Sequence, residues 1–126
     1  MLLKLLYVGT GGCVGAILRY LSSGWMQKWF PRSFYPWGTF FVNILGCLLI
    51  GFLMGLVNTR QMFSPQFRLL VFAGFLGSFT TFSTFAYESM MLLRDGQFLL
   101  FVLNAGGQLL LGLAAVLAGL YLSRII

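Results

Sequence analysis

The chain has 126 residues, of which 60% are hydrophobic and only 8% charged, and its mean hydropathy is +0.94. A water-soluble domain of this size needs roughly a quarter of its residues charged, so this composition excludes one. A membrane-spanning helix takes about 20 apolar residues. At most four crossings therefore fit, and no length remains for a separate catalytic or nucleic-acid-binding domain. The net charge is +6, but the basic residues are scattered singly, a pattern typical of anchoring at the membrane edge.

The sequence also lacks most of the side chains that enzymes use. It contains no histidine, and Glu88 and Asp95 are its only acidic residues, which excludes Ser-His-Asp triads and imidazole metal sites. Cys13 and Cys47 each lie in an apolar stretch, so we interpret both as small buried packing residues rather than as a disulfide or a zinc site. We therefore predict that the chain is not an enzyme.

Four apolar stretches are long enough to be transmembrane helices. They cover residues 2–21, 37–57, 67–93 and 98–122. The connection 22–36 carries the tryptophan, tyrosine and basic residues of a membrane–water interface. The sequence thus predicts an all-α membrane protein, with residues 1–126 forming a single four-helix domain.

The basic residues at the span ends favour neither orientation in the membrane. Four would lie on the side of the two termini and four on the other side: Lys4, Arg60, Arg68 and Arg124 against Arg19, Lys28, Arg32 and Arg94. Because lysine and arginine near span ends set the orientation, this tie predicts insertion both ways, which lets oppositely oriented copies pair. The alternative is that Arg19, partly inside the first span, hides a real bias.

Small residues recur at helical spacing in these spans. Gly11 and Gly15, and then Gly51 and Gly55, form two small-xxx-small faces, and glycines also stud the fourth span. Such faces let helix backbones approach closely in compact bundles and in oligomers.

Polar residues inside the spans are the best candidates for function, because burying them in lipid is costly. Asn43 lies in the second span with Thr39 one turn before it on the same face. Its amide either bonds a neighbouring helix or faces water or a ligand. In the fourth span Asn104, Gln108 and Gly112 form a polar stripe, which either lines a hydrated path or cross-links helices.

The third span holds five hydroxyl residues within seven positions, residues 78–84, next to Gly74 and Gly77. Either the helix breaks there, or it continues and its hydroxyls bond back to the preceding turn. A break would free backbone carbonyls, which suit a small alkali cation. Phe82 and Phe85 share one helix face. Their positive ring edges can partly solvate an anion, although such a pair is more often packing.

These segments together resemble the CrcB/Fluc-type fluoride channels over essentially the whole chain. The matching residues are Gly11-Gly12-Cys13-Val14-Gly15-Ala16 with Arg19, Pro36-Trp37-Gly38-Thr39 with Asn43, Gly74-Phe75-Leu76-Gly77, and Thr80-Thr81-Phe82-Ser83-Thr84-Phe85 with Glu88. The hydroxyl and phenylalanine run is specific at that distance from the asparagine, whereas a glycine pair alone is not.

The resemblance implies a passive fluoride exporter that protects the cell from fluoride. It implies four helices per chain with the third broken in mid-membrane, an antiparallel homodimer in the bacterial cytoplasmic (inner) membrane among its lipids, and no nucleic-acid partner. Asn43 would donate its amide to fluoride, and Phe82 and Phe85 would present ring edges to it. Ser83, Thr84 and Thr39 would supply hydroxyls.

The resemblance also implies a structural sodium ion at the dimer centre, held by the backbone carbonyls of Gly77 and Thr80 from both subunits. In the fourth helix the family commonly has an aromatic residue and hydroxyls where this chain has Asn104, Gln108 and Gly112. Both amides can still donate hydrogen bonds to an anion.

The main alternative is a small four-helix multidrug exporter that is coupled to protons and also inserts both ways. Such a carrier needs a titratable group in the membrane. Glu88 is the one candidate, towards the end of the third span. A non-transporting membrane subunit is a third possibility, and it would move no ions in liposomes.

Overall fold

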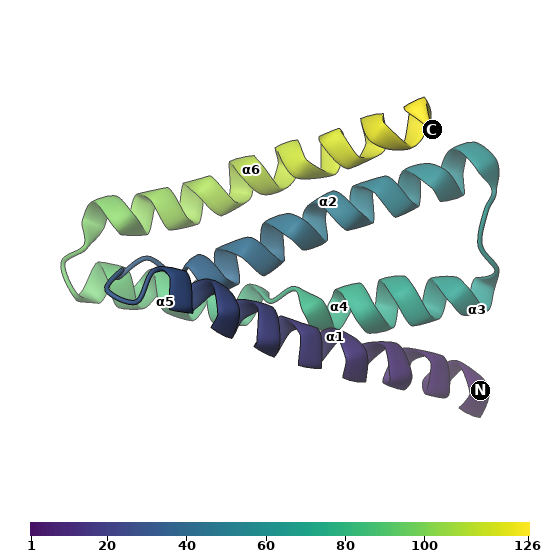
Figure 1. The fold of residues 1–126 in the computed structure, drawn as a ribbon, viewed down its shortest axis with the longest axis horizontal. Coiled ribbons are helices and arrows are strands. Elements are labelled where there is room, and N and C mark those ends of the chain that lie inside the picture. Colours follow the sequence, from purple (N-terminus) through teal and green to yellow (C-terminus); the bar gives the residue numbers. More distant parts are fainter.

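The computed structural model describes all of residues 1–126, and it is entirely helical. Its four long apolar spans are α1 (Leu2–Trp29), α2 (Trp37–Arg60), a segmented third span from Pro65 to Arg94, and α6 (Phe98–Ile125). The two termini and the turn between α2 and α3 lie at one end of the molecule (Figure 1). The prediction of an all-α chain with four spans is confirmed.

The first span is longer than predicted. The expected connection at residues 22–36 is helical as far as Trp29, and only Phe30–Pro36 lies between α1 and α2. No proline occurs before Pro31, and Gly24 alone does not end a helix, since a single interior glycine costs only about 1 kcal/mol. At 1.5 Å per residue the 28 residues of α1 extend about 42 Å, enough to cross the hydrocarbon core and reach the interface.

The third span consists of four successive pieces. They are α3 (Pro65–Arg68), the π-helix η1 (Leu69–Leu76), α4 (Gly77–Phe79) and α5 (Phe82–Arg94). Ser64 caps the start, because its side chain accepts a hydrogen bond from the Phe67 amide at 3.2 Å. The sequence did not predict the wide π-helical turns of η1.

A break separates α4 from α5 at two threonines. Thr80 and Thr81 both have extended backbone conformations, with ψ angles of 159° and 115°. Thr81 then caps α5, because its hydroxyl accepts from the Thr84 amide at 3.3 Å. The Thr80 hydroxyl donates to the Leu76 carbonyl at 3.0 Å. This one hydroxyl therefore bonds back to the preceding turn, as expected for hydroxyls in a continuous helix. The expected break in mid-span is confirmed.

The two glycine faces lie within the chain. Gly11 and Gly15 of α1 face the carbonyls of Leu70 and Phe75, and a Cβ atom at either glycine would collide with that backbone. A Cβ atom at Gly51 or Gly55 of α2 would likewise collide with α6. These glycines therefore pack the subunit's own helices together.

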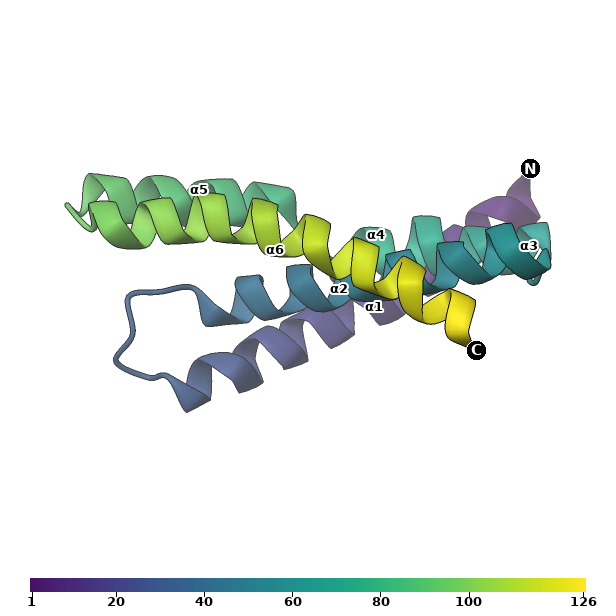
Figure 2. The same ribbon diagram turned by 90° about the horizontal axis from the view of Figure 1, so that it is seen from above.

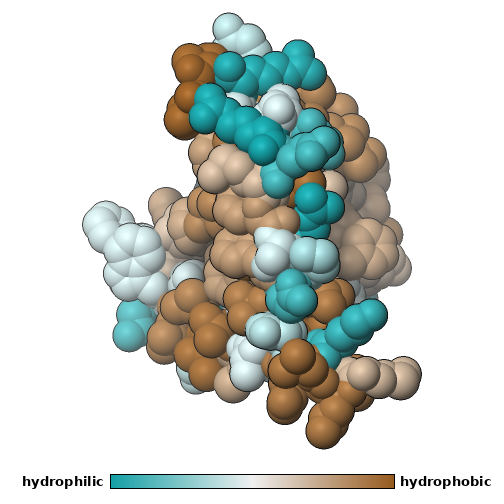
Figure 3. Space-filling view, turned by 90° about the vertical axis from the view of Figure 1, so that its right-hand side faces the viewer, coloured by the Kyte–Doolittle hydropathy of each residue, from teal (hydrophilic) through white to brown (hydrophobic).

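Most of the apolar surface remains uncovered. Only 21 of the 126 residues are buried, so lipid or another protein chain must cover the rest of this apolar surface. Seen from the end with the termini, hydrophilic residues spread across a face that otherwise shows hydrophobic ones (Figure 3). This arrangement is that of a multi-pass membrane protein.

Candidate functional site

Two hollows meet at Thr81. The first, which we call the vestibule, has a volume of about 1110 Å³ and lies among α1, α2 and α5, where Figure 2 shows the α1–α2 pair diverging from α5 and α6. The second, which we call the groove, has a volume of about 430 Å³. The groove is lined by residues of α2, the third span and α6, among them Asn43, Thr80, Phe82, Phe85 and Gln108. Thr81 lines both hollows.

Asn43 holds the broken backbone of the third span. Its Oδ1 accepts the Thr81 amide N–H at 2.8 Å, and its Nδ2 donates to the Thr81 carbonyl at 3.1 Å. These two bonds replace helical ones, which is why a break can exist at this depth. Asn43 therefore bonds a neighbouring span, one of its two expected roles, and it also lines the groove.

A chain of side-chain hydrogen bonds continues from Asn43 into α6. The Asn43 Nδ2 also donates to Gln108 Oε1 at 2.8 Å, and Gln108 Nε2 donates to Asn104 Oδ1 at 2.9 Å. Asn104 Nδ2 donates to the Ser89 hydroxyl at 2.9 Å, which donates to the Phe85 carbonyl at 2.7 Å. The polar stripe of the fourth span thus cross-links α2, α5 and α6, and Gln108 also faces the groove.

Phe82 and Phe85 lie together at the groove, with ring centroids 5.6 Å apart and an interplanar angle of 49°. The Phe82 ring is 79% exposed, although it lies in the middle of a membrane span. Lipid or a second chain is therefore needed to complete the surroundings of this ring.

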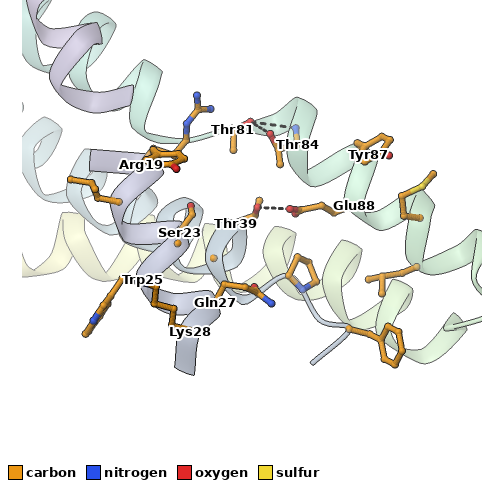
Figure 4. Close-up of a pocket in the computed structure, with 18 of the residues that line it drawn as sticks. Arg19, Ser23, Trp25, Gln27, Lys28, Thr39, Thr81, Thr84, Tyr87 and Glu88 are labelled. Carbon is orange, nitrogen blue, oxygen red and sulfur yellow. Dashed lines mark hydrogen bonds between the residues drawn. The ribbon is translucent and has the colours of Figure 1, made fainter. Parts of the chain in front are cut away.

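The vestibule combines hydroxyl groups with charge. Thr39 donates to Glu88 Oε1 at 2.9 Å, as the close-up in Figure 4 shows. The other carboxylate oxygen of Glu88 is buried without a partner. Arg19 and Lys28 lie in the wall of the same hollow together with Glu88 and Asp95, so the vestibule carries charges of both signs.

The hydroxyls of α5 divide between different surroundings. Thr84 lines the vestibule and its hydroxyl accepts from that of Thr81 at 2.9 Å. Ser83 is exposed and lines neither hollow. Within one chain, Ser83 therefore lies outside both the vestibule and the groove.

The break also removes a helical hydrogen bond from the Gly77 carbonyl of the third span. In a continuous helix the Thr81 N–H would bond the Gly77 carbonyl, but here it bonds Asn43. Gly77 is exposed and Thr80 is half-buried on the groove side. Backbone carbonyls are hard oxygen ligands, so their chemistry fits a small alkali cation.

Sequence reasoning missed two residues of this arrangement. Thr81 is not distinguished from the other hydroxyl residues by the sequence, although threonine is among the residues preferred at a helix N-cap. Ser89 was not singled out. Its link to Asn104 joins residues 15 apart on two helices, and no spacing rule within one helix could predict it.

Comparisons with known proteins identify the family of this chain. Residues 6–120 match the family model described as "CrcB-like protein, Camphor Resistance (CrcB)". A protein of Maridesulfovibrio salexigens named "Fluoride-specific ion channel FluC" is 48% identical over 98% of this chain and 97% of its own length. The proteins of that name from Solidesulfovibrio magneticus and Campylobacter jejuni are 44% and 48% identical, covering 100% and 82% of this chain and 100% and 84% of their own. This chain belongs to the CrcB-like family.

Proposed function

We propose that this protein is a fluoride-selective channel that exports fluoride passively and so reduces its toxicity to the cell. The observation that carries the proposal is the groove: an amide, a broken helix and two phenylalanine rings line one hollow in mid-span. The family membership and the printed names of the relatives support fluoride as the ion.

Fluoride is small and strongly hydrated, so a selective path must replace its water with hydrogen-bond donors. Asn43 supplies an amide, and the edges of Phe82 and Phe85 carry partial positive charge. Thr84 supplies a hydroxyl on the vestibule side, and Thr39 supplies one there once it releases Glu88 Oε1. Ser83 supplies a hydroxyl on the outer surface of α5. Gln108 and Asn104 extend the polar line into α6.

The absence of a fixed cation along this line suits conduction. No lysine or arginine lines the groove, whose lining side chains are all neutral. Several weak donors bind an anion strongly enough to admit it and weakly enough to release it. Arg19 would raise the anion concentration in the vestibule and leave release unhindered.

The working unit is an antiparallel homodimer in the bacterial inner membrane. The tied charge count supports dual insertion, and the exposed Phe82 ring supports a second chain beside α5. A Cβ atom at Gly106 or Gly107 of α6 would meet no other atom of the chain within 4 Å. This part of α6 can therefore pack closely against a partner helix.

A sodium ion would bind the carbonyls of Gly77 and Thr80 from both subunits. It would contribute positive charge between the two anion paths and join the two broken helices. The freed Gly77 carbonyl supports this assignment.

The test is ion flux from liposomes that contain the purified protein. We expect fluoride to leave far faster than chloride, as a charge-carrying flux that needs no proton gradient. Equal chloride flux would contradict the proposal. A strict requirement for protons would instead favour the multidrug exporter, for which no observation speaks beyond the presence of Glu88.

A further inference from the structure

Asn43 has no free hydrogen-bond donor in this structure. An amide nitrogen carries two N–H groups, and here one donates to the Thr81 carbonyl and the other to Gln108 Oε1. An anion that binds Asn43 must therefore displace one of these two acceptors.

The two acceptors differ in how easily they move. The Thr81 carbonyl belongs to the backbone, and the backbone N–H of Thr81 also donates to Asn43 Oδ1. Gln108 Oε1 lies at the end of a side chain with three rotatable bonds, and Gln108 lines the groove through which the anion would arrive. Gln108 is thus the acceptor that can give way.

The remaining contacts fix which end of the Gln108 amide faces Asn43. Its Nε2 donates to Asn104, which is 0% exposed. Asn104 donates in turn to Ser89, whose hydroxyl donates to the Phe85 carbonyl. Each group in this chain donates to the next, so the Gln108 oxygen is directed at Asn43.

We propose that Gln108 acts as an internal competitor for the anion site: its amide oxygen occupies the donor of Asn43, and fluoride gains that donor by displacing it. This inference rests on the proposed function. It makes Gln108 a positioning residue that sets the fluoride concentration at which Asn43 becomes occupied. The apparent dissociation constant equals the intrinsic constant divided by the fraction of molecules in which the Asn43 donor is free.

The test is Gln108→Met, which keeps the length of the side chain and removes its acceptor. Fluoride raises the unfolding temperature of a protein that binds it in the folded state. We expect the fluoride concentration that gives a fixed rise in unfolding temperature in detergent to fall roughly two- to tenfold, the factor that one net hydrogen bond of about 0.5–1.5 kcal/mol corresponds to. Sodium gluconate replaces sodium fluoride so that sodium stays constant.

Gln108→Ser is the second variant, because its hydroxyl is too short to reach Asn43 and a small polar residue suits a buried position if methionine prevents folding. Gln66→Met is the matched control, since Gln66 is exposed on α3 and lies in neither hollow. The control should leave the fluoride concentration that gives this fixed rise unchanged.

If the Gln108 variants need the same or a higher fluoride concentration for this fixed rise in unfolding temperature, the inference is overturned, because Gln108 would then be neutral or an anion ligand. Failure of the proposed function has a different signature. In that case wild-type liposomes release chloride as fast as fluoride, whatever the Gln108 variants do.

Discussion

The Asn43 side chain makes two hydrogen bonds to Thr81, one with its backbone N–H at 2.8 Å and one with its backbone carbonyl at 3.1 Å. Thr81 is the residue shared by the vestibule and the groove. A single side chain of α2 thus fixes the backbone at the boundary between the two hollows. The same amide is the proposed anion ligand, so structure and conduction depend on one group.

Asn43→Asp keeps the acceptor of this side chain and removes its donor. The carboxylate still accepts from the Thr81 N–H, but it donates neither to the Thr81 carbonyl nor to Gln108, and it repels an anion. We expect fluoride flux to fall by at least tenfold, and each buried acceptor left unpaired to cost roughly 1–3 kcal/mol of stability. Flux from liposomes and thermal unfolding in detergent measure the two effects.

The matched control is Asn58→Asp, at an exposed position near the end of α2. It introduces the same charge without touching the groove, so flux and unfolding temperature should match wild type. Normal fluoride flux in Asn43→Asp would show that the path does not use this amide.

Phe82→Ile and Phe85→Ile test the role of the ring edges. Isoleucine is apolar and of moderate size but has no positive edge for an anion. We expect each change to abolish most fluoride flux while the homodimer persists in size-exclusion chromatography. Phe98→Ile, at an exposed position at the start of α6, is the control. Unchanged flux in both groove variants would leave the rings with a packing role only.

The spans could be predicted from residues close in sequence, because apolar length determines a membrane helix. The hydroxyl cluster at residues 78–84 left a broken and a continuous third span both open, and the family resemblance implied the break. The end of α1 at Trp29 was missed because amphipathic residues fit both an interfacial helix and a loop. The π-helix η1 has no composition that distinguishes it from an α-helix.

The candidate site could be predicted only as a set of residue types. The sequence showed that Asn43, Gln108 and Asn104 were polar at depth, but the partner of each lies on another helix. Whether an amide faces a ligand or a second amide depends on the rotation of packed helices. Spacing within one helix does not determine this rotation.

Glu88→Gln distinguishes the channel from the proton-coupled exporter. Glutamine keeps an acceptor for the Thr39 hydroxyl, now bonded at 2.9 Å, but it cannot exchange a proton. For a channel we expect fluoride flux that remains independent of an imposed pH gradient. An exporter would instead lose its drug resistance, measured as growth of expressing cells on a toxic organic cation.

Gly119→Ala tests the packing of α6 on α2. A Cβ atom at Gly119 would collide with the Leu48 carbonyl and the Phe52 amide nitrogen, which belong to the backbone of α2. Because overpacking costs typically about 1–3 kcal/mol, we expect a clearly lower unfolding temperature. Gly9→Ala in α1 is the control, since Gly9 is exposed and nothing lies within 4 Å of its Cβ position. A fall in stability at Gly9 equal to that at Gly119 would contradict this difference.

Removing sodium tests the cation proposed at the break in the third span. If the carbonyls of Gly77 and Thr80 from two subunits share one ion, then purification in N-methylglucamine should raise the monomer fraction, measured by cross-linking. Thr80→Ala should keep the same sodium dependence, because it retains the carbonyl and loses only the hydroxyl bond to Leu76. Dimers that persist equally without sodium would mean that the freed Gly77 carbonyl is satisfied by another donor, and the broken helices would then need no shared ion.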